Sequence, residues 1–131
     1  QRENEFIDKA LQLPGSAEEV IGSLLNGAAK SYTRPGYPRG CLIVTGAIVA
    51  TPDLKGVVEM LREFRKTAEQ RIANRLSQDK VRLPEGSDTE ELARFFSGVL
   101  FGMSVLARDG KSEEELKTYA EMATRVLFSR G

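Results

Sequence analysis

Cys41 is the side chain of this sequence best suited to nucleophilic or redox chemistry. It is the only cysteine among 131 residues. It follows Arg39 closely and lies at the expected start of a helix, and both a nearby positive charge and a helix N-terminus favour the thiolate form of cysteine. A thiolate at this position could sense oxidants or electrophiles. The alternative is an inert thiol buried in the core, which is the common state of a lone cysteine.

Other residue types that do chemistry are missing or placed differently. The sequence has no histidine, which removes the commonest general base and the commonest metal ligand. A single cysteine can form neither an internal disulfide nor a thiolate metal cage. The carboxylates gather in expected first turns of helices, where they suit the helix dipole. The sequence therefore predicts no enzyme, no metal and no cofactor, and turnover of a substrate by the purified chain would overturn this expectation.

The charge balance excludes a purely electrostatic role. Nineteen basic residues are matched by 19 acidic ones, so no net field draws the chain to nucleic acid or to an anionic membrane. The longest apolar run, residues 41–50, is too short to span a bilayer. We therefore expect a cytoplasmic protein with no membrane partner. One basic run is interleaved with Glu59, Glu63 and Glu69, which favours a solvated, salt-bridged helix face over a phosphate-binding stripe; it consists of Arg62, Arg65, Lys66, Arg71 and Arg75.

The elements that position these side chains are predicted to be helices. A serine precedes a glutamate by three residues at Ser16, Ser87 and Ser112, the pattern of a capping box. Thr51-Pro52-Asp53 gives a fourth helix start, with proline at the first helical position. Apolar residues then recur at steps of three and four through 20–32, 54–76, 88–108 and 112–129, and Phe6 to Leu11 form the tail of an opening helix. The prediction is an all-α antiparallel bundle of about six helices in one domain, residues 1–131.

The stretch CLIVTGAIVA, residues 41–50, is ambiguous by composition. Its β-branched residues are typical of a buried strand. A lone strand would leave its backbone groups unpaired, whereas a short enclosed helix satisfies them internally. We therefore expect a short, buried central helix at residues 41–50.

Several segments resemble the C-terminal regulatory domain of tetracycline-repressor (TetR) family transcription regulators. The most specific segment is Tyr37-Pro38-Arg39-Gly40-Cys41-Leu42-Ile43-Val44, which is similar to the opening of the short sixth helix in one large subgroup. The long helix from Thr51-Pro52-Asp53 to about Gln78 is similar to the seventh helix. Leu83-Pro84 and residues 88–95 resemble the loop before the eighth helix and its start, and residues 102–110 resemble its end. The helix from Ser112 corresponds to the ninth.

The resemblance carries expectations about assembly and output. It implies that the last two helices pair with those of a second subunit as a four-helix bundle, and that the fourth to eighth helices enclose a ligand pocket. It also implies that the opening helix, near Phe6, Ile7 and Ala10, passes motion to DNA-reading heads. The helix-turn-helix that carries these heads in the family is absent from this sequence, so we expect an N-terminal portion to be missing and DNA to be bound only through it.

Candidate pocket residues are apolar or weakly polar positions on the inward faces of the middle helices. Small-molecule cavities are mostly apolar with a few polar groups that fix orientation, so Tyr32 and Thr45 are the polar positions of most interest. The alternative is that these side chains simply fill the core. The full set is Leu25, Tyr32, Cys41, Thr45, Ile48, Met60, Leu61, Phe64, Phe96, Leu100 and Met103.

The last two helices carry more large apolar residues than a small monomer can bury, which predicts a twofold dimer. Gly98-x-x-x-Gly102 suggests a tight crossing with a neighbouring helix, room for a ligand, or a close contact within the monomer. The candidate interface residues are Leu92, Phe95, Val99, Gly102, Leu106, Tyr119, Met122 and Val126.

The sequence thus predicts a small-molecule-sensing, dimerising domain of a TetR-like regulator, and most members of that family are repressors. Its ligand would be a small apolar or amphipathic molecule. The rival interpretation is a dimeric helical scaffold with a filled core and no ligand.

Overall fold

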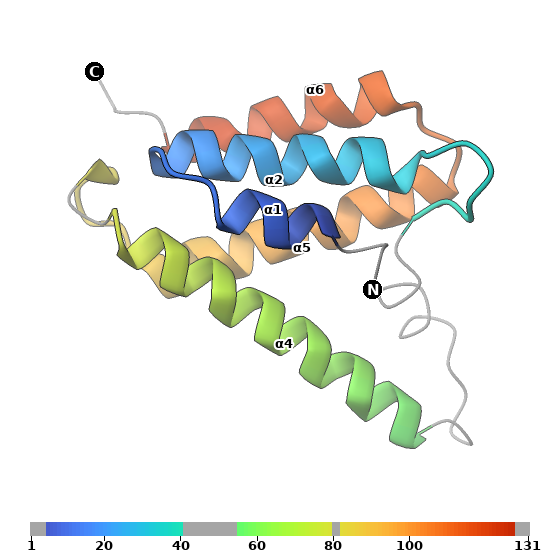
Figure 1. Cartoon of the computed structure of the whole chain (residues 1–131), viewed down its shortest axis with the longest axis horizontal. Coiled ribbons are helices and arrows are strands. Elements are labelled where there is room, and N and C mark those ends of the chain that lie inside the picture. The colour runs from blue at the N-terminus through green and yellow to red at the C-terminus, as the bar shows by residue number, and fades with distance from the viewer. Residues whose placement is uncertain (1–4, 41–54, 80–81, 128–131) are drawn as a thin grey trace.

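The structure is a computed structural model that describes residues 5–40, 55–79 and 82–127. Five α-helices and a short 3-10 helix make up the described chain (Figure 1): α1 (Glu5–Leu11), α2 (Ala17–Tyr32), α4 (Lys55–Ser77), α5 (Thr89–Arg108), α6 (Glu113–Thr124) and η4 (Arg125–Leu127). No strand occurs in the described residues, so the all-α prediction is confirmed. The helix expected at 41–50 and the start expected at Thr51-Pro52-Asp53 lie outside the described residues.

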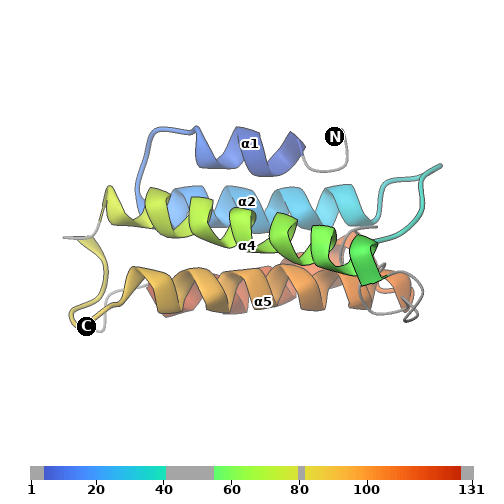
Figure 2. The same ribbon diagram turned by 90° about the horizontal axis from the view of Figure 1, so that it is seen from below.

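Helix α2 is the centre of the fold. It lies beside α6 in Figure 1, and the turned view of Figure 2 shows α1 on one side and α5 on the other, with α2 and α4 between them. Its apolar positions occupy a wide face, so it can be covered by several helices at once. Buried on it are Ala17, Val20, Ile21, Leu24, Leu25, Ala28, Ala29 and Tyr32.

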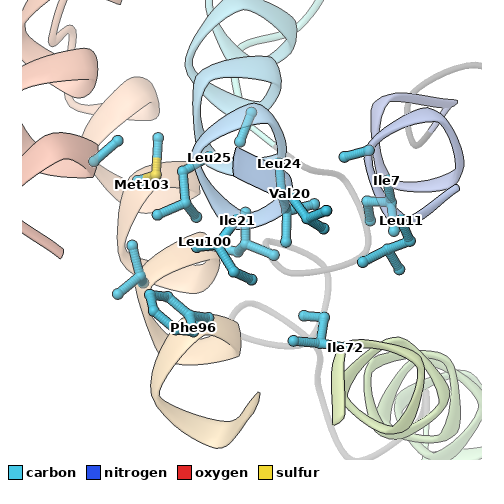
Figure 3. Close-up of a cluster of buried hydrophobic side chains, with 14 of the residues drawn as sticks. Ile7, Leu11, Val20, Ile21, Leu24, Leu25, Ile72, Phe96, Leu100 and Met103 are labelled. Atoms are coloured by element: carbon cyan, nitrogen blue, oxygen red, sulfur yellow. The ribbon is translucent and has the colours of Figure 1, made fainter. Parts of the chain in front are cut away.

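The core joins this face of α2 to all the other described α-helices. Ile7 and Leu11 come from α1 and Ile72 from α4, and Phe96 from α5 is fully enclosed (Figure 3). Leu116 and Ala120 of α6 are also buried. The apolar residues expected at helical spacing in 20–32 therefore form the core, together with those of 88–108 that face α2.

Helix α1 packs closely on α2 because Gly27 gives it room. A Cβ on Gly27 would lie 3.1 Å from the Cβ of Phe6. The Phe6 ring meets the ring of Tyr32 edge to face, with centroids 5.7 Å apart. An alanine at residue 27 would push Phe6 away, so this glycine sets the distance between the two helices.

Helix α4 is held at its C-terminal half. Of the α4 side chains that the structure describes, those buried are Ile72, Ala73 and Leu76. Polar contacts reinforce the same half: Arg71 pairs with Asp8 of α1 at 2.8 Å, and the Arg75 guanidinium donates to the carbonyl oxygens of Leu13 and Gly15 at 2.9 and 3.1 Å. The earlier half of α4 diverges from the other helices in Figure 1.

One more polar contact links the end of α4 to the start of α2. The carboxylate of Asp79 accepts a hydrogen bond from the Ala17 amide at 2.9 Å, one of the backbone donors that has no partner inside a helix. Arg71 and Arg75 on α4 and Asp79 in the turn after it, spaced four residues apart, thus bind three successive segments. The sequence interpretation expected acidic partners within α4; the partners of Arg71 and Arg75 are instead on α1 and the turn after it.

Two of the three predicted capping boxes are confirmed. The Ser16 hydroxyl accepts from the Glu19 amide at 3.2 Å and the Glu19 carboxylate accepts from the Ser16 amide at 3.0 Å. The same reciprocal pair joins Ser112 and Glu115.

The third prediction, at Ser87, is wrong. Asp88 is the N-cap of α5, and its carboxylate accepts from the amides of Glu90 and Glu91 at 2.9 and 3.2 Å. The Ser87 hydroxyl donates instead to the carbonyl oxygen of Pro84. Two adjacent residues can each cap a helix, and here the Asp88 side chain takes the position, because a carboxylate is a stronger acceptor than a hydroxyl.

The capping box of α6 makes this helix sensitive to acid. The backbone hydrogen bond from Ser112 holds the pKa of Glu115 below its ordinary value of 4.5. A lowered pKa means that the ionised group stabilises the folded state above pH 4.5, and that this contribution is lost as the pH falls through the folded value. We expect Glu115→Gln to destabilise the protein at neutral pH, and the difference from the unmodified chain to shrink on acidification in urea titrations. Glu114→Gln, one residue away, is the control and should show a smaller pH-dependent difference.

Candidate ligand pocket and dimer face

The Tyr37-Pro38-Arg39-Gly40 segment fastens the turn after α2 to the end of α5. The Arg39 guanidinium donates from Nε to the carbonyl oxygen of Ala107 at 2.6 Å and from a terminal nitrogen to that of Lys111. The last carbonyl groups of a helix have no partner inside that helix. Arg39 therefore caps the C-terminal end of α5, although it is 68 residues away in the sequence. We call Arg39 and Gly40 the latch.

Gly40 completes the latch by close backbone contact. Its φ is 81°, and a Cβ at this position would lie 2.7 Å from the carbonyl oxygen of Ser104 and 2.9 Å from the Ser104 hydroxyl. Its amide donates to the carbonyl oxygen of Tyr32 at 2.9 Å. Nearby, the Arg34 guanidinium stacks on the ring of Tyr37 with 3.7 Å to the centroid. The sequence segment that carried the resemblance therefore has a physical role, because it fixes where the chain leaves α2.

The predicted pocket residues fall into three groups. Those buried in the core are Leu25, Tyr32, Phe96, Leu100 and Met103, and all but Tyr32 are labelled in Figure 3. On α4, Met60 and Phe64 are exposed, at 64% and 41%, and Leu61 is half-buried. Cys41, Thr45 and Ile48 lie outside the described residues. The structure thus brings together the α2 and α5 members of the set, while those on α4 lie on its less anchored half.

A groove of about 280 Å³ lies between α2 and α6. It contains none of the predicted pocket residues, since its lining is Gly22, Asn26, Ala120, Glu121, Thr124 and Arg125. In the described part of the chain, no group of acidic side chains is arranged to hold a metal ion. No described helix has both the length and the apolar character of a membrane span.

The predicted dimer residues divide between an exposed face and the core beneath it. Phe95, Tyr119, Met122 and Val126 are exposed, Met122 most of all at 63%. Tyr119 and Met122 on α6 and Val126 on η4 recur at steps of three and four, which places them on one side of this last helical segment, and Phe95 adds an exposed ring on α5. Leu92 and Leu106 are partly buried against the core, and Val99 is a core residue at 6% exposure. We call the four exposed residues together with Gly98 the α5–α6 face.

The two glycines of Gly98-x-x-x-Gly102 have different surroundings. A Cβ on Gly102 would lie 3.0 Å from the hydroxyl of Tyr119, so this glycine allows a close contact within the monomer. A Cβ on Gly98 would meet nothing within 4 Å. Packing within the described chain therefore explains why residue 102 is a glycine. It does not explain Gly98, which weakens the helix and lies on an open surface.

Phe101 is an exposed apolar residue of α5, at 37%, that belongs to none of the candidate sites. A helical projection of α5 would have placed it on a different side from Phe95, because six residues correspond to well over one and a half turns.

Comparison with known proteins gives a consistent result. No protein-family model matches the sequence. The HTH-type transcriptional repressor ComR of Escherichia coli is 26% identical over 113 residues, which are 85% of this chain and 54% of that protein. The chain thus spans about half the length of this curated relative.

Solved structures extend the likeness to the fold. The TetR family transcriptional regulator CifR, in a complex with 26-base-pair operator DNA, is 32% identical with a TM-score of 0.87, over 95% of this chain and 66% of that one. A Rhodococcus protein described as a TetR transcriptional regulator is 30% identical with a TM-score of 0.78, over 94% and 66% of the two chains. These relatives belong to a class of proteins that are not enzymes. The chain is therefore related, in sequence and in fold, to the TetR family of transcriptional regulators.

Proposed function

We propose that this chain forms the small-molecule-sensing and dimerising domain of a cytoplasmic TetR-like regulator that acts as a repressor. The single observation that supports this most is the apolar α5–α6 face in a chain whose fold is that of TetR regulators. Four large apolar side chains and the open Gly98 lie on it. Soluble monomers rarely expose apolar surface of this kind. A second copy turned about a twofold axis would cover the face with itself.

DNA recognition would come from outside the matched region. CifR was solved with operator DNA, and this chain matches 66% of the CifR chain. The remaining part of such a regulator would carry the DNA-reading heads, and α1 would be the output of the sensor. A ligand that binds one arrangement of the helices more tightly than another would shift the population of arrangements. A changed distance between the two heads would spoil their fit to half-sites about one DNA turn apart.

The dimer is tested by sedimentation equilibrium of the chain as it stands. A single chain has a mass of 14.5 kDa, and we expect twice that mass at micromolar concentration. A monomeric mass at all concentrations would contradict the proposed dimer and the mechanism that depends on it.

The rival interpretation, a dimeric scaffold with a filled core, is favoured by one observation. Leu25, Phe96 and Met103 are fully enclosed, and Leu100 nearly so. Side chains that fill a core at native density leave no room for a ligand.

Two neighbouring leucines on α2 distinguish sensor from scaffold without knowledge of the ligand. Leu24 and Leu25 are both 0% exposed, but only Leu25 is a predicted pocket residue. In a filled core, either Leu→Ala change removes packed atoms and leaves a cavity, at a cost of about 3 kcal/mol. Beside a pre-existing pocket the removed atoms border open space, so Leu25→Ala should cost roughly 1 kcal/mol less than Leu24→Ala. Urea unfolding of the two variants measures the difference, and equal losses would support the scaffold.

A further inference from the structure

The groove between α2 and α6 has features of a binding site separate from the predicted pocket. Its walls are one turn of each helix: Gly22 and Asn26 lie four residues apart on α2, and Glu121 and Arg125 lie four residues apart on α6 and its end. Residues at this spacing lie on the same side of a helix. Ala120 and Thr124 are buried and form the floor.

Gly22 is unexplained by packing within the described chain. A glycine inside a helix destabilises it relative to alanine, and such a glycine is usually needed because another group comes close. Gly27, on the same helix, has such a neighbour in Phe6, but a Cβ on Gly22 would meet nothing within 4 Å. The space over Gly22 is therefore open to an occupant that is not part of the described chain.

The polar groups of the groove are of two kinds. The Thr124 hydroxyl donates to the carbonyl oxygen of Ala120 at 2.8 Å, so it cannot also donate a hydrogen bond to a ligand. Asn26, Glu121 and Arg125 make no side-chain hydrogen bond or ion pair with the residues that the structure describes. The groove therefore offers a carboxylate, a guanidinium and an amide within a space of about 280 Å³.

We propose that this groove binds a small zwitterion of the free α-amino acid type. Arg125 would donate to the ligand carboxylate, because its guanidinium matches a carboxylate in a two-pronged geometry. Glu121 would take the ammonium group, and the Asn26 amide can donate to one end and accept from the other. The ligand backbone would lie over Gly22, where a side chain would otherwise stand.

The test is a titration of the ¹⁵N-labelled chain with L-alanine, followed by ¹H–¹⁵N NMR. We expect shifts at the Gly22 amide, the Asn26 side-chain amide and the Arg125 guanidinium. Acetate supplies only the carboxylate and methylammonium only the ammonium, and each should bind at least about tenfold more weakly than alanine, because each loses one charged hydrogen-bonded pair.

Variants assign the binding to the groove. Arg125→Ala and Glu121→Gln should each weaken binding about tenfold or more, whereas Glu114→Gln, on α6 outside the groove, should leave it unchanged. Gly22→Leu should abolish binding while α2 stays folded, because leucine favours the helix and fills the space.

Absence of shifts at these groups with alanine would overturn the proposal. So would equal binding of acetate, which would mean a simple anion site, or undiminished binding by Gly22→Leu. None of these outcomes bears on the dimer or on the predicted pocket, so failure here leaves the proposed function standing.

Discussion

Replacing Gly40 with alanine is expected to lower the free energy of unfolding by about 3 kcal/mol. Two effects add. The residue has a φ of 81°, a left-handed conformation that costs a residue with a Cβ about 1 to 2 kcal/mol. The new methyl group would also lie 2.7 Å from the carbonyl oxygen of Ser104, which is backbone inside α5 and cannot move aside freely.

Gly36 is a matched control for this prediction. Its φ of 82° is nearly the same, but a Cβ there would meet nothing within 4 Å. Gly36→Ala should therefore show only the conformational part, about 1 to 2 kcal/mol. Urea unfolding of both variants separates the two effects, and equal losses would mean that the contact with Ser104 yields without strain.

Replacing Met122 with glutamate is expected to dissociate the proposed dimer. Met122 is 63% exposed in the single chain and lies on the α5–α6 face. In a twofold interface the substitution buries two unpaired carboxylates, for which we expect a cost of about 4 kcal/mol, or a roughly thousandfold rise in the dissociation constant. Sedimentation equilibrium over a range of concentrations measures the change.

Two controls keep this result specific. Met122→Leu retains an apolar side chain of similar volume and should preserve the dimer. Gln12→Glu introduces the same carboxylate at an exposed residue of the turn after α1, away from the face, and should also preserve it. If Met122→Glu remains a dimer with unchanged affinity, the α5–α6 face is not the interface.

The sequence predicted best the features that depend on near neighbours. The reciprocal bonds at Ser16 and Ser112 join residues three positions apart, and helical geometry alone brings them together. Ser87 shows the limit of this reasoning. The same spacing was present, but Asp88 beside it is the stronger acceptor, and a pattern of types and spacing does not rank two adjacent candidates.

Contacts between distant segments could not be read from the pattern. Helical spacing placed Arg71 and Arg75 on one face of α4 but could not say that Asp8 and the carbonyl of Leu13 would lie opposite them. In the same way, the resemblance singled out Arg39 and Gly40, while their partners Ala107 and Ser104 are more than sixty residues away. For Gly102, periodicity left three explanations open, and only the position of the Tyr119 hydroxyl selects the contact within the monomer.

The anchoring of α4 gives this helix a mechanical character. Among the residues that the structure describes, the buried side chains of α4, its ion pair with Asp8 and its hydrogen bonds to Leu13 and Gly15 come from the stretch that begins at Arg71. The preceding part of α4, back to Lys55, is about 24 Å long at 1.5 Å per residue. A rotation of the helix about the stretch from Arg71 onward therefore moves its Lys55 end the furthest. A tilt of about 10° about this stretch would move the Lys55 end through about 4 Å. Conversely, a displacement of the helix near Met60 would be transmitted to α1 through the ion pair between Arg71 and Asp8.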